Sequence, residues 1–66
     1  MIIKINGMAE EAGANRTIAA LLEDKGLSCE RVVVEHNSRI IPRDELASVA
    51  LKENDSLEIV SFVGGG

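Results

Sequence analysis

The stretch Leu57-Glu58-Ile59-Val60-Ser61-Phe62-Val63 decides the fold, because it predicts the strand around which the rest of the chain is arranged. Successive side chains of a strand point to opposite faces, so Leu57 and Ile59 share one face and Val60 and Phe62 share the other. A strand that is apolar on both faces is usually a central strand of its sheet. We therefore expect other strands to flank this segment on both sides.

This strand continues without a polar spacer into Gly64-Gly65-Gly66. Glycine has no side chain, so such a tail can enter a slot that is too narrow for any other residue. Three extended residues span about 10 Å. The reactive group there is the α-carboxylate, which becomes electrophilic once ATP adenylates it. We interpret Gly66 as the reacting residue and Gly64 and Gly65 as the threading arm; the alternative is an inert, unstructured end.

The residues before the final strand predict a hairpin, a helix and two further strands. Asn6-Gly7 is a strong hairpin-turn signal, because both residues accept positive φ. Thr17 is suited to cap the helix, and Gly26 is suited to end it. The expected elements are strands over 1–5 and 8–12, a helix from Thr17 to Gly26, strands over 31–37 and 40–41, a short helical turn capped by Asp44 over 46–50, and the last strand over 57–63.

One helix packed across a small mixed sheet is an economical way to bury the apolar residues of this pattern. The expected fold is therefore α+β, of the β-grasp, ubiquitin-like kind. We expect residues 1–63 to form the domain and residues 64–66 to form a flexible glycine tail. The expected core consists of Ile3, Ile5, Leu21, Leu22, Val32, Val34 and Ile59.

The length, charge and composition of the chain exclude several classes of function. A chain of 66 residues has room for one small domain and no deep substrate cavity. The net charge of −4 and the absence of Trp and Tyr argue against nucleic-acid binding. A single cysteine suits a reducing compartment, and no apolar run approaches the roughly 20 residues of a membrane span. The sequence therefore predicts a cytoplasmic protein.

The remaining chemically interesting side chains give weaker signals. Cys29 is the one thiol that could carry sulfur, but a lone cysteine more often behaves as a small apolar residue. His36 lacks the companions of a metal site or a catalytic triad, so no metal site is expected. Three arginines are interpreted either as partner contacts or as solvated charges: Arg16, Arg39 and Arg43.

Several segments together resemble the ThiS family of thiamine-pathway sulfur carriers. They cover nearly the whole chain in the family's order, and the most specific is Ile-Pro-Arg combined with the terminal Phe-Val-Gly-Gly-Gly. The sequence departs from the family pattern over residues 8–13 and at Ser38. The matching segments are Thr17–Leu22, Val34–Asn37, Ile40–Arg43, Asp55–Val60 and Phe62–Gly66.

The resemblance implies a carrier, not an enzyme, with no bound cofactor of its own. An E1-like adenylating enzyme similar to ThiF would use ATP to adenylate Gly66. A sulfur-donor system would then convert Gly66 to a thiocarboxylate, and a thiazole synthase similar to ThiG would consume the sulfur. The alternatives are a carrier like the small subunit of molybdopterin synthase, a ubiquitin-like protein modifier, or a β-grasp binding module with an inert tail.

The final strand also predicts where partners dock. Val60 and Phe62 should point away from the helix, and Val33 and Ile2 should lie on the same outer face beside the root of the tail. Exposed apolar patches on small proteins often mark interaction surfaces. We therefore expect Phe62, Val63, Val60 and Val33 to contact partners, unless Phe62 folds back over the edge of the sheet.

Overall fold

The computed structural model describes residues 1–62, and its elements follow the predicted order. Val63 and the predicted glycine tail, residues 64–66, lie outside the described residues. The elements are β1 (Ile2–Ile5), β2 (Met8–Glu11), α1 (Ile18–Asp24), β3 (Val32–His36), β4 (Arg39–Ile41), the 3-10 helix η1 (Arg43–Glu45) and β5 (Ser56–Ser61).

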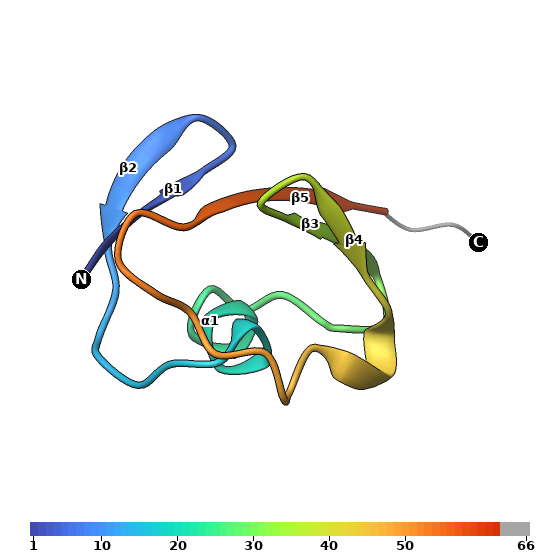
Figure 1. Cartoon of the computed structure of the whole chain (residues 1–66). Helices are drawn as coiled ribbons and strands as arrows, with labels where there is room; N and C mark the ends of the chain where they lie inside the picture. The colour runs from blue at the N-terminus through green and yellow to red at the C-terminus, as the bar shows by residue number, and fades with distance from the viewer. Residues whose placement is uncertain (63–66) are drawn as a thin grey trace.

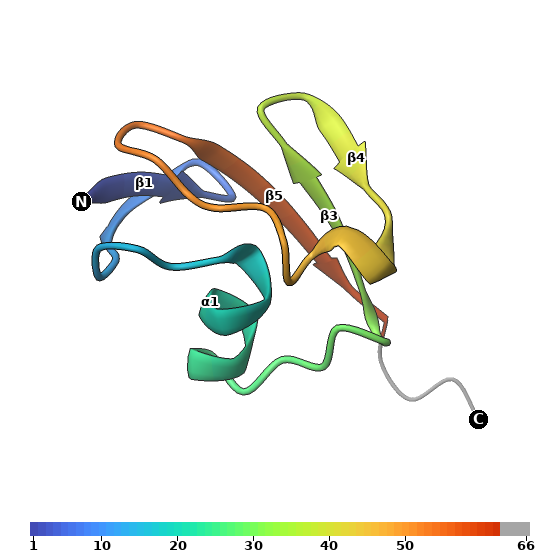
Figure 2. The ribbon, with the colours of Figure 1, turned by 60° about the horizontal axis from the view of Figure 1, so that its bottom comes forward.

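The strands form one mixed sheet in the order β2-β1-β5-β3-β4, and α1 crosses one face of it (Figures 1 and 2). β5 pairs parallel with β1 and antiparallel with β3, and each hairpin is antiparallel. The last strand is thus central, as its two apolar faces predicted, and the arrangement is the expected β-grasp fold.

The core lies between α1 and the inner face of the sheet. Ile3, Leu22 and Leu57 are completely buried there. Val32 and Ile59 were predicted to be core residues, but both are only half-buried against the core. Ile59 lies beyond Ile5, the last residue of β1, so one of its flanks has no neighbouring strand. The other fully or nearly buried apolar residues are Ile5, Ala12, Ile18, Leu21, Val34, Ile41, Leu46 and Leu51.

The predicted turn and helix-end residues are confirmed. Asn6 and Gly7 adopt φ angles of 51° and 84° in the turn between β1 and β2. The Thr17 hydroxyl accepts the Ala20 N–H at 3.1 Å, capping α1. Gly26 takes a φ of 74° just after the helix ends. Each residue supplies a backbone conformation or an acceptor that this position requires.

The second helical segment was predicted wrongly. The expectation was a turn over residues 46–50 capped by Asp44, but η1 spans Arg43–Glu45 and follows directly on Pro42. Proline is well suited to the start of a helical turn because its φ is already fixed near the helical value. Ala50 instead forms an isolated bridge with Thr17, which ties this connection to the start of α1.

Within residues 1–62, no helix has both the length and the apolar character needed to cross a bilayer.

Candidate functional site

The C-terminal end of β5 is held by β3. The Phe62 N–H donates to the Arg31 carbonyl oxygen at 2.7 Å, so the ladder between the two strands extends one residue past Ser61. The predicted reacting residue Gly66 and the threading residues Gly64 and Gly65 lie outside the described residues, as does Val63. Their predicted roles therefore stay predictions.

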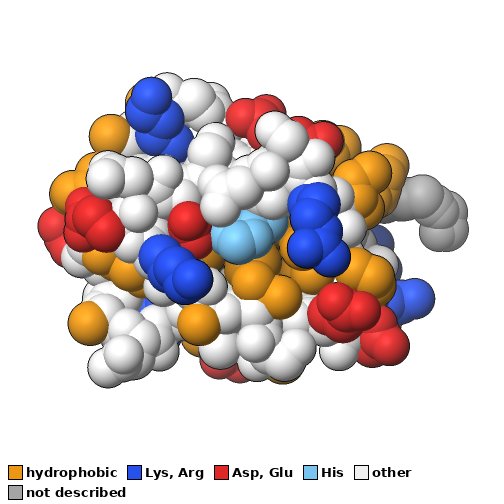
Figure 3. Space-filling view, viewed as in Figure 1, with side chains coloured by type: hydrophobic (Ala, Val, Ile, Leu, Met, Phe, Trp, Pro, Cys, Tyr) orange, Lys and Arg blue, Asp and Glu red, His pale blue; other side chains and the backbone are white. Residues whose placement is uncertain are grey.

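An apolar cluster, called the outer patch below, lies on the sheet face opposite α1 and consists of Val33, Val60 and Phe62. Val33 is directly opposite Val60 in the β3–β5 pairing. The three side chains are 39 %, 55 % and 59 % exposed, so Phe62 does not fold back over the edge of the sheet. Figure 3 shows hydrophobic side chains gathered where the described chain ends.

The surroundings of the outer patch differ from the prediction at two residues. Ile2 does lie on the outer face, but it is level with Asn54, whose N–H donates to the Ile2 carbonyl. It is therefore six residues along β5 from Val60, about 20 Å at strand spacing, and is not part of the patch. The sequence analysis missed Ile40, which is 66 % exposed and lies opposite Glu35, diagonal to Val33.

Two glutamates lie next to the outer patch in a repulsive arrangement. Glu35 and Glu58 are directly opposite each other in the β3–β5 pairing. Neither forms an ion pair with another described residue. Like charges at directly opposed positions destabilise a sheet. The outer face thus combines exposed apolar side chains with uncompensated negative charge.

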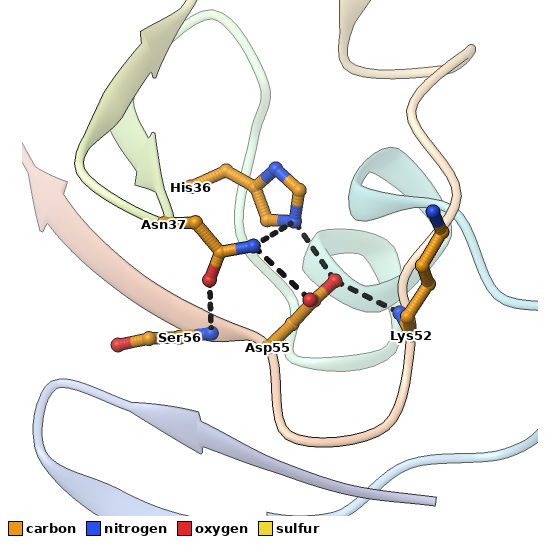
Figure 4. Close-up of polar contacts among 5 residues, drawn as sticks. All are labelled: His36, Asn37, Lys52, Asp55 and Ser56. Carbon is orange, nitrogen blue, oxygen red and sulfur yellow. Dashed lines mark hydrogen bonds and ion pairs between the residues drawn. The ribbon is translucent and has the colours of Figure 1, made fainter.

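A second polar feature joins the turn between β3 and β4 to the start of β5 (Figure 4). His36 Nε2 lies 2.8 Å from Asp55 Oδ2, and Asn37 Nδ2 donates to Asp55 Oδ1 at 3.1 Å. The Lys52 N–H donates to Oδ2 at 2.8 Å. The Asn37 side-chain oxygen in turn accepts the Ser56 N–H at 2.9 Å.

These contacts set the ionisation of Asp55, which is only 7 % exposed. Burial by itself would raise the pKa of Asp55. The hydrogen bonds from His36, Asn37 and the Lys52 N–H outweigh it, with help from attraction to His36, and lower the pKa below the ordinary 3.8. Asp55 is therefore a carboxylate at neutral pH. Because a carboxylate only accepts hydrogen bonds, His36 Nε2 must carry the proton of their contact.

This network holds the turn between β3 and β4 against the segment that leads into β5, which is a structural role. Both carboxylate oxygens of Asp55 and both polar atoms of the Asn37 side chain have partners inside the network. Among residues 1–62, no three His, Cys, Asp or Glu side chains are grouped to hold a metal ion. Cys29 is a free thiol that is half-buried against the core. Arg16 pairs with Asp24, while Arg39 and Arg43 are exposed.

Comparison with known proteins agrees with this geometry. A solved structure of the thiamine biosynthesis protein ThiS from Geobacter metallireducens superimposes with a TM-score of 0.84 and 26 % identity over the full length of both chains. The sulfur carrier protein ThiS of Bacillus subtilis is 44 % identical over 50 residues, which are 76 % of each chain.

Thiazole synthase from Paramagnetospirillum magneticum is 42 % identical over all 66 residues of this chain, which make up 20 % of that protein. The chain thus spans about a fifth of the length of the thiazole synthases it matches. The sequence profile of the ThiS family matches residues 3–66, nearly the whole chain. The chain therefore belongs to the ThiS family.

Proposed function

We propose that this chain is a sulfur carrier of thiamine biosynthesis that holds sulfur as a thiocarboxylate on Gly66. The observation that carries the proposal is the ThiS family match, which continues through the glycines to Gly66. The name of the Bacillus subtilis relative, a sulfur carrier protein, supports it. The described fold supports it as well, because its central strand leads the chain directly toward those glycines.

The proposed chemistry has two steps, and neither needs a side chain of this protein. A carboxylate oxygen of Gly66 attacks the α-phosphorus of ATP on an E1-like adenylating enzyme, and pyrophosphate leaves. A hydrosulfide equivalent from the sulfur-donor system then attacks the acyl carbon, and AMP leaves. The acyl group keeps its oxidation state, and one oxygen has been exchanged for sulfur. Thiazole synthase is the proposed acceptor of that sulfur.

A tail without side chains suits these steps because the partner enzymes must supply the alignment of the reacting atoms. The outer patch is the proposed docking surface for them. Val60 and Phe62 are more than half exposed close to the point where the tail begins. A partner that covers them removes apolar surface from water while its active site receives the tail.

The direct test is mass spectrometry of the intact chain after incubation with an adenylating enzyme, ATP and a sulfur donor. We expect the mass increase of one oxygen-to-sulfur exchange, located on Gly66 by fragmentation. Omitting ATP is the matched control and should leave the mass unchanged. Conjugates on lysines of other proteins would identify a protein modifier instead, and an unaltered mass in the complete reaction would contradict the proposal.

The docking surface is tested by Phe62→Ala. Truncation of an exposed interface anchor should weaken partner binding by about 1–3 kcal/mol. The free domain should lose less than the roughly 3–5 kcal/mol of a buried phenylalanine, since Phe62 is 59 % exposed. Calorimetric titration and urea unfolding measure the two quantities. Ile2→Ala, on the same face but far from the tail, is the control and should bind normally.

A further inference from the structure

The hydrogen-bonding edges of β5 are not equally occupied. On the β3 side, the even-numbered residues make the bonds: Phe62 N–H donates to Arg31, and the Ser56 carbonyl accepts from Asn37 at 2.8 Å. In an antiparallel ladder every second residue faces the same neighbour. Residues 58 and 60 therefore also bond toward β3, and this edge is filled along its whole length.

The odd-numbered residues of β5 face β1, and Asn6 is their last partner. The Asn6 N–H donates to the Leu57 carbonyl at 2.8 Å. Beyond this point the Asn6 side chain, and not the backbone of β1, forms the hydrogen bonds to β5. Its oxygen accepts the Ile59 N–H at 2.8 Å, and its Nδ2 donates to the Ile59 carbonyl at 3.3 Å. One asparagine thus extends the β1 edge by one more pairing position.

Ser61 is the next odd-numbered residue, and β1 offers nothing to pair with it. The register between β1 and β5 ends at Ile5 opposite Leu57, and the chain turns away at Asn6 and Gly7. Figures 1 and 2 both show β5 running on beyond β1. Ser61 is exposed, so its N–H and carbonyl form an open strand edge within the described part of the molecule.

A groove of about 350 Å³ lies beside this edge on the side of the sheet that carries α1. Ile5, Met8, Leu27 and Ile59 provide its apolar lining. The ion pair between Lys25 and Glu10, with an N–O distance of 2.7 Å, adds a polar border. Met8 is 71 % exposed, so a side chain entering the groove would find apolar surface still open to contact.

We propose that an extended segment of thiazole synthase adds as a strand to the open edge of β5 at Ser61 and places an apolar side chain in this groove. An unpaired strand edge is matched by extended backbone, because the affinity then comes from main-chain hydrogen bonds and the selectivity from alternate side chains in pockets. A helix or a folded loop cannot present its N–H and carbonyl groups in that way, since they are already used internally.

Thiazole synthase is the chosen occupant because two thiazole synthases each contain a stretch matching the whole of this chain. A stretch similar to this chain therefore occurs in one polypeptide with a thiazole synthase, which brings the two parts close together. The inference rests on the proposed function and deepens it, by naming a backbone contact next to the root of the tail. It is separate from the outer patch, which lies on the other face of the sheet.

Ser61→Pro tests the edge by removing one donor. Proline removes the N–H that faces the open side, while the bonds to β3, made by residues 60 and 62, remain. Proline is tolerated where the N–H faces solvent, so the variant should melt close to the wild-type temperature. We expect its affinity for a separately prepared thiazole synthase to fall at least tenfold in calorimetric titration. Ser61→Ala removes only the hydroxyl and should bind within about twofold of wild type.

Amide hydrogen exchange on the wild-type chain gives a readout that does not depend on a variant folding. The Ser61 amide should exchange rapidly in the free chain and at least tenfold more slowly with saturating thiazole synthase. Exchange unchanged by the synthase, or protection produced only by the adenylating enzyme, overturns the inference. Thiocarboxylate formation on Gly66 needs no synthase, so its presence alongside an unprotected Ser61 rejects the edge contact and leaves the proposed function intact.

Discussion

Asp55 connects three parts of the chain through one carboxylate, and this makes the stability of the domain depend on pH. Because its pKa is lowered in the folded state, its contribution is present above the ordinary pKa of 3.8 and is lost as the pH falls through the lower folded-state value. Asp55→Asn replaces an acceptor by a group that also carries two donors. At neutral pH we expect a loss of about 1–3 kcal/mol of unfolding free energy.

The difference between wild type and Asp55→Asn should shrink as the pH is lowered below 3.8 and through the lower folded-state pKa of Asp55, because the wild-type carboxylate then becomes protonated as well. Urea unfolding across this pH range measures it. Asp44→Asn, at an exposed position in η1, is the control and should track the wild type throughout. A constant difference at every pH would show that the effect of Asp55 is steric and not electrostatic.

At the level of single residues, the sequence predicted those features whose cause is local. The Thr17 cap and the positive φ angles of Asn6, Gly7 and Gly26 follow from what each residue type can do within one turn. The contact between His36 and Asp55 was missed because it joins positions 19 residues apart. Only the sheet topology brings them together, and a lone histidine in a sequence carries no sign of its partner.

At the level of elements, the directly opposed pair of half-buried Glu35 and exposed Glu58 is a defect in an otherwise well-matched pairing of β3 and β5. Glu58→Lys would place opposite charges across the two central strands. Since opposed pairs each contribute roughly 0.2–1 kcal/mol, we expect a stabilisation of about 1 kcal/mol when repulsion is replaced by attraction. Salt should reduce this gain, because Glu58 is exposed and Glu35 is only half-buried.

Urea unfolding at low and high salt measures the gain. Glu30→Lys is the matched control, because it changes the net charge equally but lies outside every strand. Equal stabilisation of both variants would attribute the gain to the overall charge of −4 and not to the cross-strand pair.

The central position of β5 was accessible from the sequence because it follows from the two apolar faces of that strand. The first and last residues of each element could not be predicted from the sequence. The helical turn after Pro42 was displaced from the predicted residues because Leu46, expected inside that turn, packs into the core immediately after η1, with 2 % exposure. The position of Ile2 relative to the outer patch depends on the parallel register of β1 and β5, which no local pattern specifies.

For the molecule as a whole, folding and the proposed chemistry should be separable. Among residues 1–62, the buried apolar residues all lie between Ile3 and Leu57. Glycine has no side chain, so Gly65 and Gly66 have none to add to this core. Deleting Gly65 and Gly66 should therefore leave the melting temperature nearly unchanged and abolish thiocarboxylate formation. Thermal unfolding and intact-mass measurements on the same sample test both halves.

Leu57→Ala should have the opposite effect to the tail deletion, because it lowers stability and leaves the proposed chemistry intact. Leu57 is completely buried in the central strand, and its truncation should cost about 2–5 kcal/mol of unfolding free energy. At a temperature where the variant is still folded, its glycines should accept sulfur as in wild type. If the tail deletion destabilised the domain as much as Leu57→Ala does, the glycines would be part of the fold, and their proposed role as a separate carrier arm would be wrong.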